Sequence, residues 1–178
     1  IHSRTDKEII ESSNFAKKHH VNKIVLIGDS EIEKAVSFIK ENNIPVILER
    51  IHSLPNTTDD AIFSPFKIAS VLNENNILYC LAMSGDMEAM NSRNLPFNAG
   101  ETVAYGVEYE KAVQSITLNA AHILGISDDF GSIETGKSAT LIISEGDALD
   151  MRTNNIIYAL IEGRNVDLNN FQKELYNK

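Results

Sequence analysis

The sequence has 178 residues, 43% of them hydrophobic, and carries a formal net charge of −9 with a pI near 5.0. Sequence-independent nucleic-acid binding depends on clustered Lys and Arg, so this acidic balance argues against a nucleic-acid partner. No apolar run approaches the ~20 residues that cross a bilayer, and none has the form of a signal peptide. The single cysteine, Cys80, excludes an internal disulfide and a cysteine-based zinc cage, and its apolar neighbours predict a buried, inert thiol.

The first half of the chain alternates between two patterns. Helical spacing covers residues 6–19, 30–42 and 65–74, and short apolar runs typical of strands follow at 23–27, 44–48 and 77–82. Short joins between such elements imply parallel strands with right-handed crossovers. Because the strands are almost continuously apolar, we expect a sheet that is covered on both faces.

The second half begins with one more helical pattern, over residues 113–126, which we expect to end at or just beyond Gly125. Turn-forming residues follow, and the pattern then changes to strand-like runs at 140–144 and 156–161. A polar helical tail is predicted over residues 169–177. The chain therefore passes from alternating α/β structure to a small β region and then to a tail.

Two architectures supply parallel strands of this kind: an open doubly wound sheet and a (β/α)8 barrel. No Gly-x-Gly-x-x-Gly follows any strand, which weakens a dinucleotide-binding sheet. The strands before Gly125 make up about half of a barrel, which usually takes ~250 residues. Since the chain opens with Ile1 and His2 in mid-pattern, we expect it to be part of a longer protein. A complete small α/β domain is a weaker alternative.

Three motifs near the middle of the chain resemble the amidohydrolase superfamily. They are Thr-Leu-Asn-Ala-Ala at residues 117–121, Leu-Gly-Ile at 124–126 and Gly-Ser-Ile-Glu-x-Gly-Lys-x-Ala-x-Leu-Ile-Ile at 131–143. Together with NSRNLPFNAGETVAYG at 91–106, their spacing is similar to that of imidazolonepropionase-related bacterial amidohydrolases. The resemblance implies the C-terminal half of a TIM-like barrel over residues 1–126, C-terminal strands of a small β-sandwich over 127–168 and a helical tail over 169–178. The β-strands that would complete the sandwich are not in this chain, so we expect exposed sheet edges and a homo-oligomer.

The resemblance also implies a metal centre at the carboxyl ends of the barrel strands, where such enzymes place their chemistry. It makes His2 the metal-binding histidine of the fifth strand. It makes Asp86 the eighth-strand aspartate, which binds metal and takes the proton of the attacking water. At the sixth strand, where the family commonly has histidine, this chain has Gly28 and Asp29. The expected cofactor is Zn²⁺ or another divalent metal, which lowers the pKa of bound water toward ~7.

Three further residues are candidates for substrate binding. His52, with Arg50, follows the seventh strand, while Arg93 and Asn94 could bind a substrate carboxylate. Each candidate also has a purely structural interpretation: His2 as a surface histidine, Asp86 as a turn or helix-capping residue, His52 on a solvated loop, and Arg93 with Asn94 as loop hydrogen-bonders.

The expected function of the whole protein is metal-dependent hydrolysis of a C–N bond in a cyclic amide or peptide-like substrate, by metal-activated water. We expect the 178 residues alone to be inactive, because half a barrel lacks the first-strand ligands. The alternative is a catalytically lapsed relative whose barrel serves binding or assembly. The compartment is left open between bacterial cytoplasm and periplasm.

Overall fold

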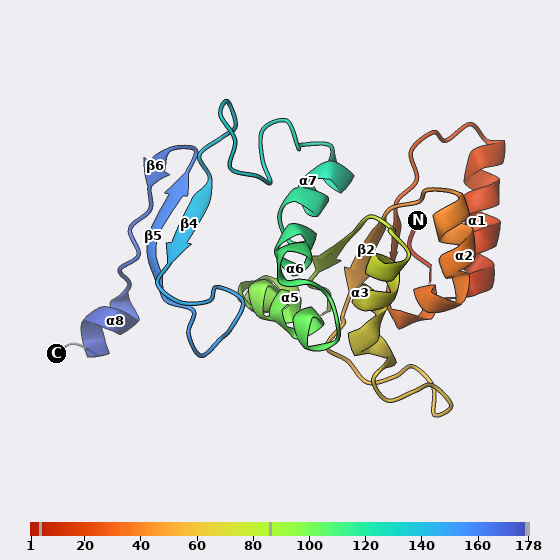
Figure 1. Cartoon of the computed structure of the whole chain (residues 1–178), viewed down its shortest axis with the longest axis horizontal. Helices are drawn as coiled ribbons and strands as arrows, with labels where there is room; N and C mark the ends of the chain where they lie inside the picture. The colour runs from red at the N-terminus through yellow and green to blue at the C-terminus, as the bar shows by residue number, and fades with distance from the viewer. Residues whose placement is uncertain (4, 86, 177–178) are drawn as a thin grey trace.

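The computed structural model describes residues 1–3, 5–85 and 87–176 (Figure 1). Its elements are, in chain order, α1 (Asp6–Lys18), β1 (Leu26–Gly28), the 3₁₀ helix η1 (Ser30–Ala35), α2 (Val36–Glu41), β2 (Val46–Glu49), α3 (Ser64–Glu74), β3 (Tyr79–Ala82), α4 (Glu88–Asn91), the 3₁₀ helix η2 (Ser92–Asn94), α5 (Leu95–Ala104), α6 (Tyr109–Ser115), α7 (Leu118–Leu124), β4 (Leu141–Ser144), β5 (Ile156–Ile161), β6 (Arg164–Asn165) and α8 (Phe171–Tyr176). No helix within these residues is long and apolar enough to span a membrane.

The first sheet is parallel, as the alternating pattern predicts. Its strands lie in the order β1-β2-β3, with Leu26 paired to Val46 and Val46 paired to Tyr79. Residues 1–3 extend the sheet beyond β1, because His2 forms an isolated parallel bridge with Ile27 and the Ser3 amide donates to the Ile27 carbonyl at 3.2 Å. His2 therefore lies within this extension of the sheet, beside the middle of β1.

One face of this sheet holds the main core. Val46 and Leu48 on β2 are fully buried, whereas Ile47 and Glu49, which alternate with them, are only partly buried. Helices α1, η1, α2 and α3 supply the apolar side chains that cover the buried face, including Ile9, Ile32, Ile39, Ile68 and Leu72. On β1 and β2 the buried positions alternate with half-buried ones, so the second face of these strands is covered only in part in this chain.

The predicted helix over residues 113–126 is two helices, α6 and α7, separated at Ile116 and Thr117. The apolar stripe runs across both and conceals the break. Thr117 has φ −129° and ψ −94°, outside the helical region, and its hydroxyl donates to the Val113 carbonyl at 2.8 Å. Gly125 ends α7 with φ +73°, as expected of a glycine C-cap.

Helix α5 had no counterpart in the sequence prediction, and a glycine at its centre contributes to that. A Cβ at Gly100 would overlap the backbone carbonyl oxygen of Leu149. Leu149 lies in the loop of residues 145–155 between β4 and β5, and its side chain is part of the main core. The glycine is therefore explained by the close approach of a loop about fifty residues away in the sequence.

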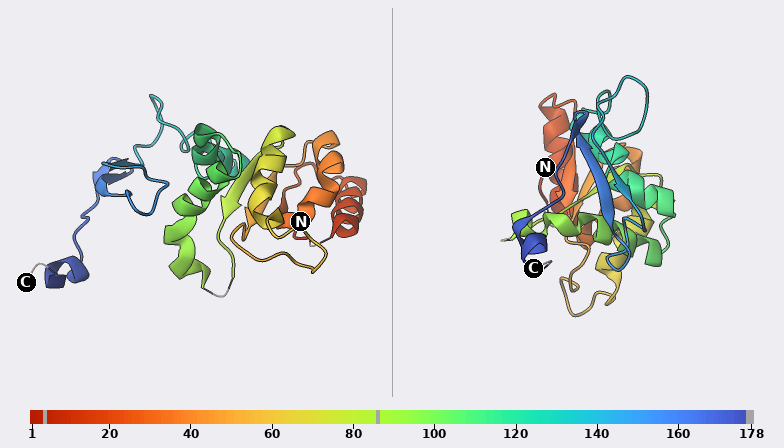
Figure 2. Two further views of the ribbon diagram at one scale, coloured as in Figure 1. Left: turned by 60° about the horizontal axis from the view of Figure 1, so that its bottom comes forward. Right: turned by 90° about the vertical axis from the view of Figure 1, so that its left-hand side faces the viewer.

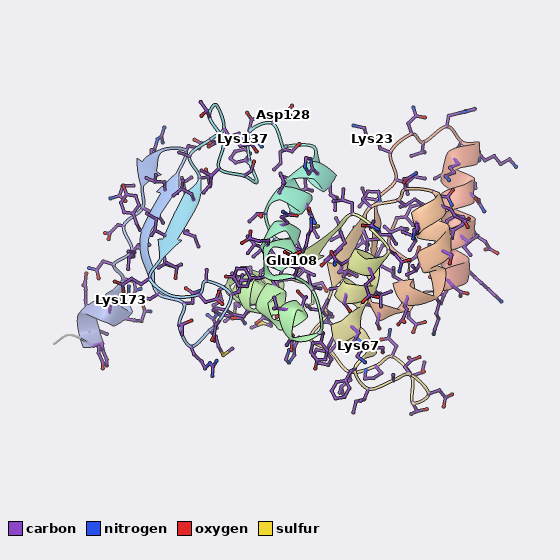
Figure 3. The ribbon with its side chains drawn as sticks, in the orientation of Figure 1. Lys23, Lys67, Glu108, Asp128, Lys137 and Lys173 are labelled. Atoms are coloured by element: carbon purple, nitrogen blue, oxygen red, sulfur yellow. The ribbon has the colours of Figure 1, made fainter. Side chains whose placement is uncertain are left out.

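The second sheet is antiparallel, in the order β4-β5-β6. It lies at the opposite end of the longest axis from α1 (Figures 1 and 2). Residues 125–140 connect α7 to β4, and the labelled Asp128 and Lys137 belong to this connection (Figure 3). Lys137 donates to Ser132 Oγ at 2.6 Å and pairs with Glu134 at 3.3 Å, which stabilises the turn.

Candidate active site at the carboxyl ends of the parallel strands

His2 and Glu49 meet at the carboxyl edge of the first sheet. His2 Nε2 lies 3.1 Å from Glu49 Oε2, although the two residues are 47 positions apart. Their side chains remain 55% and 27% exposed. Because an ionised carboxylate only accepts hydrogen bonds, the imidazole donates from Nε2, which leaves Nδ1 of a neutral ring as the acceptor.

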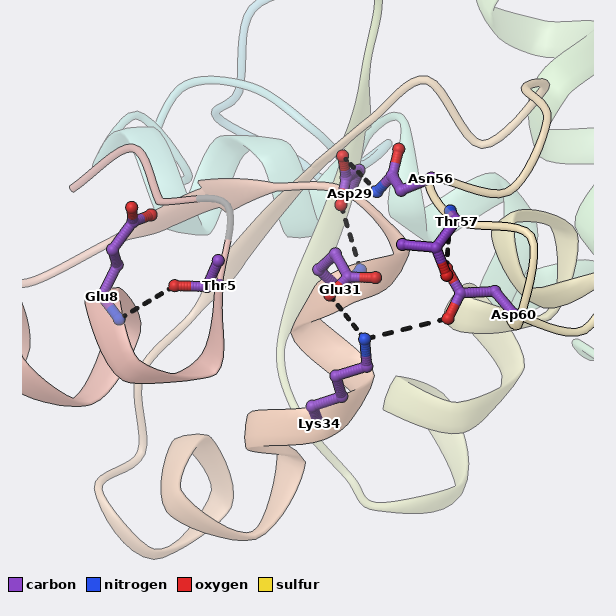
Figure 4. A network of polar contacts seen from close by, with 8 residues as sticks. All are labelled: Thr5, Glu8, Asp29, Glu31, Lys34, Asn56, Thr57 and Asp60. Carbon is purple, nitrogen blue, oxygen red and sulfur yellow. Dashed lines mark hydrogen bonds and ion pairs between the residues drawn. The ribbon is translucent and has the colours of Figure 1, made fainter.

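Asp29, which follows β1, has a structural role that Figure 4 shows directly. Its Oδ1 accepts from the Glu31 amide at 3.0 Å and caps η1, while Oδ2 accepts from Asn56 Nδ2 at 3.2 Å. Lys34 pairs with Glu31 and Asp60 in the same network. Both carboxylate oxygens of Asp29 are thus engaged, one in capping η1 and the other in holding the loop after β2 to the end of β1.

A cavity of about 820 Å³ opens beside the ends of β2 and β3. Its walls come from the residues that follow these strands, from η2, α5 and α6, and from the loop of residues 145–155. Polar side chains from all of these parts line it: Arg50, His52, Ser84, Asn94, Asn98, Glu101, Tyr109 and Asp147. The volume and the mixed lining suit a small organic ligand.

His52 is held on the wall of this cavity by Glu101 of α5. Its Nδ1 lies 3.1 Å and 3.0 Å from the two carboxylate oxygens of Glu101. The ring also meets Phe66 of α3 edge-on, with centroids 5.6 Å apart. The His52 side chain is nevertheless 71% exposed, so one edge of the ring stays open to the cavity or to solvent.

The loop of residues 145–155 is fastened to α6 across the cavity. Tyr109 donates its hydroxyl to Asp147 Oδ1 at 2.6 Å, and this hydrogen bond raises the pKa of Tyr109 to about 12. The same Asp147 oxygen accepts from the Leu149 amide at 2.8 Å. The neighbouring Asp150 pairs with Arg152 at 3.0 Å, and the hydrogen bonds from Arg152 hold the pKa of Asp150 below its usual value.

The structure brings some of the predicted site residues together and separates others. His52 and Asn94 line the cavity, whereas His2 pairs with Glu49 outside the lining, and Arg93 is exposed on η2 and does not line it. Asp86 lies outside the described residues. Sequence reasoning did not single out Glu101 or Tyr109, since their importance depends on partners that are 49 and 38 residues away.

The described residues do not complete a metal site. A catalytic zinc has three protein ligands and one open position, but no group of three or more His, Cys, Asp or Glu in the described part of the chain could hold a metal. His2 and Glu49 supply two donors of suitable chemistry.

The comparisons with known proteins agree with the barrel interpretation. The sequence pattern of the amidohydrolase family matches residues 5–169. The chain belongs to the amidohydrolase family. An amidohydrolase from Thermotoga maritima has the same fold, with a TM-score of 0.79 and 24% identity over 93% of this chain and 42% of that one. This likeness confirms the α/β fold as the C-terminal half of an amidohydrolase barrel with the strands that follow it.

Two deaminases are also similar to this chain. A 5-methylthioadenosine/S-adenosylhomocysteine deaminase from Symbiobacterium thermophilum is 30% identical over 86 residues, which are 48% of this chain and 19% of that protein. An adenosine deaminase from Xanthomonas campestris with bound zinc aligns over 99% of this chain and 48% of that one, with a TM-score of 0.52 and 18% identity. The chain therefore spans less than half the length of each of these amidohydrolase relatives.

Proposed function

We propose that the whole protein hydrolyses a C–N bond in a small cyclic amide or peptide-like substrate. The observation that carries this proposal is the clustering of polar groups at the carboxyl edge of the parallel sheet. There the His2–Glu49 pair lies at one strand end, and the cavity with His52 and Asn94 lies beside the next two. Membership of the amidohydrolase family and the deaminase relative support this reaction class, because both reactions replace nitrogen at carbon with oxygen from water.

The proposed reaction depends on a divalent metal, with Zn²⁺ as the first candidate. Members of the family typically bind divalent metals, and the adenosine deaminase neighbour has bound zinc. When bound, such a metal lowers the pKa of water toward ~7. His2 would be one ligand, through the imidazole nitrogen that Glu49 leaves free, and Glu49 fixes the ring orientation. Asp86 would bind metal and take a proton from water.

Finer assignments belong to the same proposal. The motif spacing over residues 91–106 and 117–143 supports an imidazolonepropionase-related subgroup. We also propose the division into residues 1–126, 127–168 and 169–178, with homo-oligomerisation through sheet edges. His52, Arg93 and Asn94 are the proposed substrate-binding residues, and these 178 residues alone are proposed to be inactive.

One observation favours a second candidate function, a catalytically lapsed amidohydrolase that serves binding or assembly. At the strand end where the family commonly has histidine, Gly28 has no side chain and Asp29 uses both carboxylate oxygens for loop hydrogen bonds. A lapsed protein would keep the cavity and lose the metal.

Metal analysis of the full-length encoded protein separates the two candidates. We expect at least one equivalent of zinc per chain after purification, hydrolysis of a cyclic amide such as dihydroorotate or hydantoin in a substrate screen, and loss of both in His2→Asn. His122→Asn, on α7, is the matched control and should retain its zinc. Purification without stoichiometric metal, together with no hydrolysis, would support the lapsed protein instead.

A further inference from the structure

We propose that Arg50 forms a carboxylate subsite in the cavity and that the substrate therefore carries a carboxylate beside its scissile amide. That the bound molecule is a substrate rests on the proposed function, whereas the subsite itself can be tested by binding alone. Arg50 lies directly after β2 and lines the cavity together with Ser84, which follows β3.

The backbone at Arg50 adopts an unusual conformation that directs its side chain. Its φ is +49°, in the left-handed region that residues other than glycine, asparagine and aspartate seldom occupy. The next residue, Ile51, is 3% exposed and part of the main core, so its packing holds the turn in place. Such strain is tolerated where it serves to position a group.

The guanidinium is then held across two strand ends. Arg50 Nε donates to the Ser84 carbonyl at 3.2 Å. The adjacent Gly85 has φ +120°, and a Cβ there would overlap Nη2 of Arg50. A glycine at this position therefore leaves room for the guanidinium against the loop after β3.

Those remaining N–H groups lack an acceptor. Among the described residues, Nη1 and Nη2 of Arg50 make no hydrogen bond or ion pair. The acids that line the same cavity already have partners: Glu101 has His52, Asp147 has Tyr109, and Asp150 has Arg152. Within the described lining, Arg50 is therefore held through Nε while its Nη1 and Nη2 donors have no acceptor, and a planar carboxylate is the group that such paired donors match.

Arg50 could instead serve only to clamp the loop after β3. The two roles predict different results, because a clamp affects the stability of the protein and every ligand of the cavity alike. A carboxylate subsite distinguishes a charged ligand from its neutral amide. The test therefore uses two probes of nearly the same shape, N-acetylglycine and N-acetylglycinamide.

The experiment is a titration of the ¹⁵N-labelled chain with each probe, followed by NMR. We expect N-acetylglycine to bind more tightly than N-acetylglycinamide and to shift the signals of Arg50 Nε and Gly85. Arg50→Gln should weaken N-acetylglycine binding about tenfold or more and remove the preference for the acid. Arg50→Lys, which retains the charge without the fork, should give an intermediate loss. Arg164→Gln on β6 is the control and should leave both affinities unchanged.

Three results would overturn the proposal. The first is equal binding, or no binding, of the two probes by the unaltered chain. The second is an acid preference that survives in Arg50→Gln, and the third is its loss in Arg93→Gln alone. If Arg50→Gln fails to fold, Arg50→Lys decides, because a full retention of the preference would contradict the paired hydrogen bonds. Hydrolysis is not measured, so failure here is distinct from failure of the proposed reaction.

Discussion

Two neighbouring residues at the end of β2 send their side chains to different partners. Glu49 reaches His2, beyond the end of β1, while Arg50 reaches Ser84, beyond the end of β3. Strand β2 ends at Glu49, and Arg50, the next residue, has a left-handed backbone conformation. One strand end therefore contributes both to the proposed metal centre and to the proposed carboxylate subsite.

Cys80 gives a prediction at the scale of a single residue. Its side chain is buried on β3, and burial raises the pKa of the thiol to about 11. At pH 8 the thiolate, which is the reactive form, is then roughly 100-fold scarcer than in an exposed cysteine. We expect labelling of Cys80 by iodoacetamide at pH 8 to be slower by at least that factor, measured by mass spectrometry.

The same labelling in 8 M urea is the control, and there the thiol should react at the ordinary rate of a free cysteine. Rapid labelling of the folded chain would show that β3 opens readily or that the thiol is accessible.

At the scale of elements, the strands were easier to predict than the later helices. The runs at 44–48 and 77–82 are apolar, short and bounded by turns, so local pattern was sufficient. Helix α5 contains Gly100, and a glycine is needed there because the backbone of the distant Leu149 approaches closely. The break between α6 and α7 lies within an unbroken apolar stripe. Both features depend on tertiary contacts that no local window contains.

The candidate site was predictable to the same limited extent. The rule that barrel chemistry lies after the strands located His2 and His52. It could not supply Glu101, because that residue lies within a helix that the sequence did not reveal. Nor could it show that the carboxylate of Asp29 is already hydrogen-bonded, since its partner Asn56 comes from the loop after β2.

Replacing Gly100 by alanine should change the stability of the protein in the direction opposite to the usual one. Replacing a glycine within a helix by alanine ordinarily stabilises a protein, by up to about 1 kcal/mol. Here the added methyl group would overlap the Leu149 carbonyl, so we expect Gly100→Ala to lower the free energy of unfolding by about 1–3 kcal/mol. Urea unfolding followed by circular dichroism measures it.

Asn14→Ala, at an exposed position in α1, is the matched control and should be neutral or slightly stabilising. A stabilised Gly100→Ala variant would mean that the loop of residues 145–155 does not pack against α5 in solution.

At the scale of the whole molecule, the second sheet stands out for its exposed apolar side chains. Ile142, Ile157 and Ile161 are 54%, 51% and 57% exposed, and Ile143 and Tyr158, which pair with each other on the face opposite to Ile142, are exposed as well. A sheet that is open on both faces is a strong candidate for association.

We therefore expect the chain to self-associate as its concentration rises, which light scattering after size-exclusion chromatography would detect. Ile142→Lys together with Ile157→Lys should shift the distribution toward monomer, because charges on this sheet oppose its burial against another copy. Leu54→Lys, at an 81% exposed apolar position in another loop, is the control. A chain that stays monomeric at high micromolar concentration would contradict this expectation.

Asn119 of α7 affects how such association can proceed. Its Nδ2 donates to the Tyr79 carbonyl at 3.0 Å, and β3 is the last strand of the parallel sheet in the described chain. That carbonyl faces away from β2, so it is one of the groups through which another strand would dock. With this carbonyl occupied by α7, a strand from a second copy finds one acceptor fewer at the edge of β3, which opposes association through this edge.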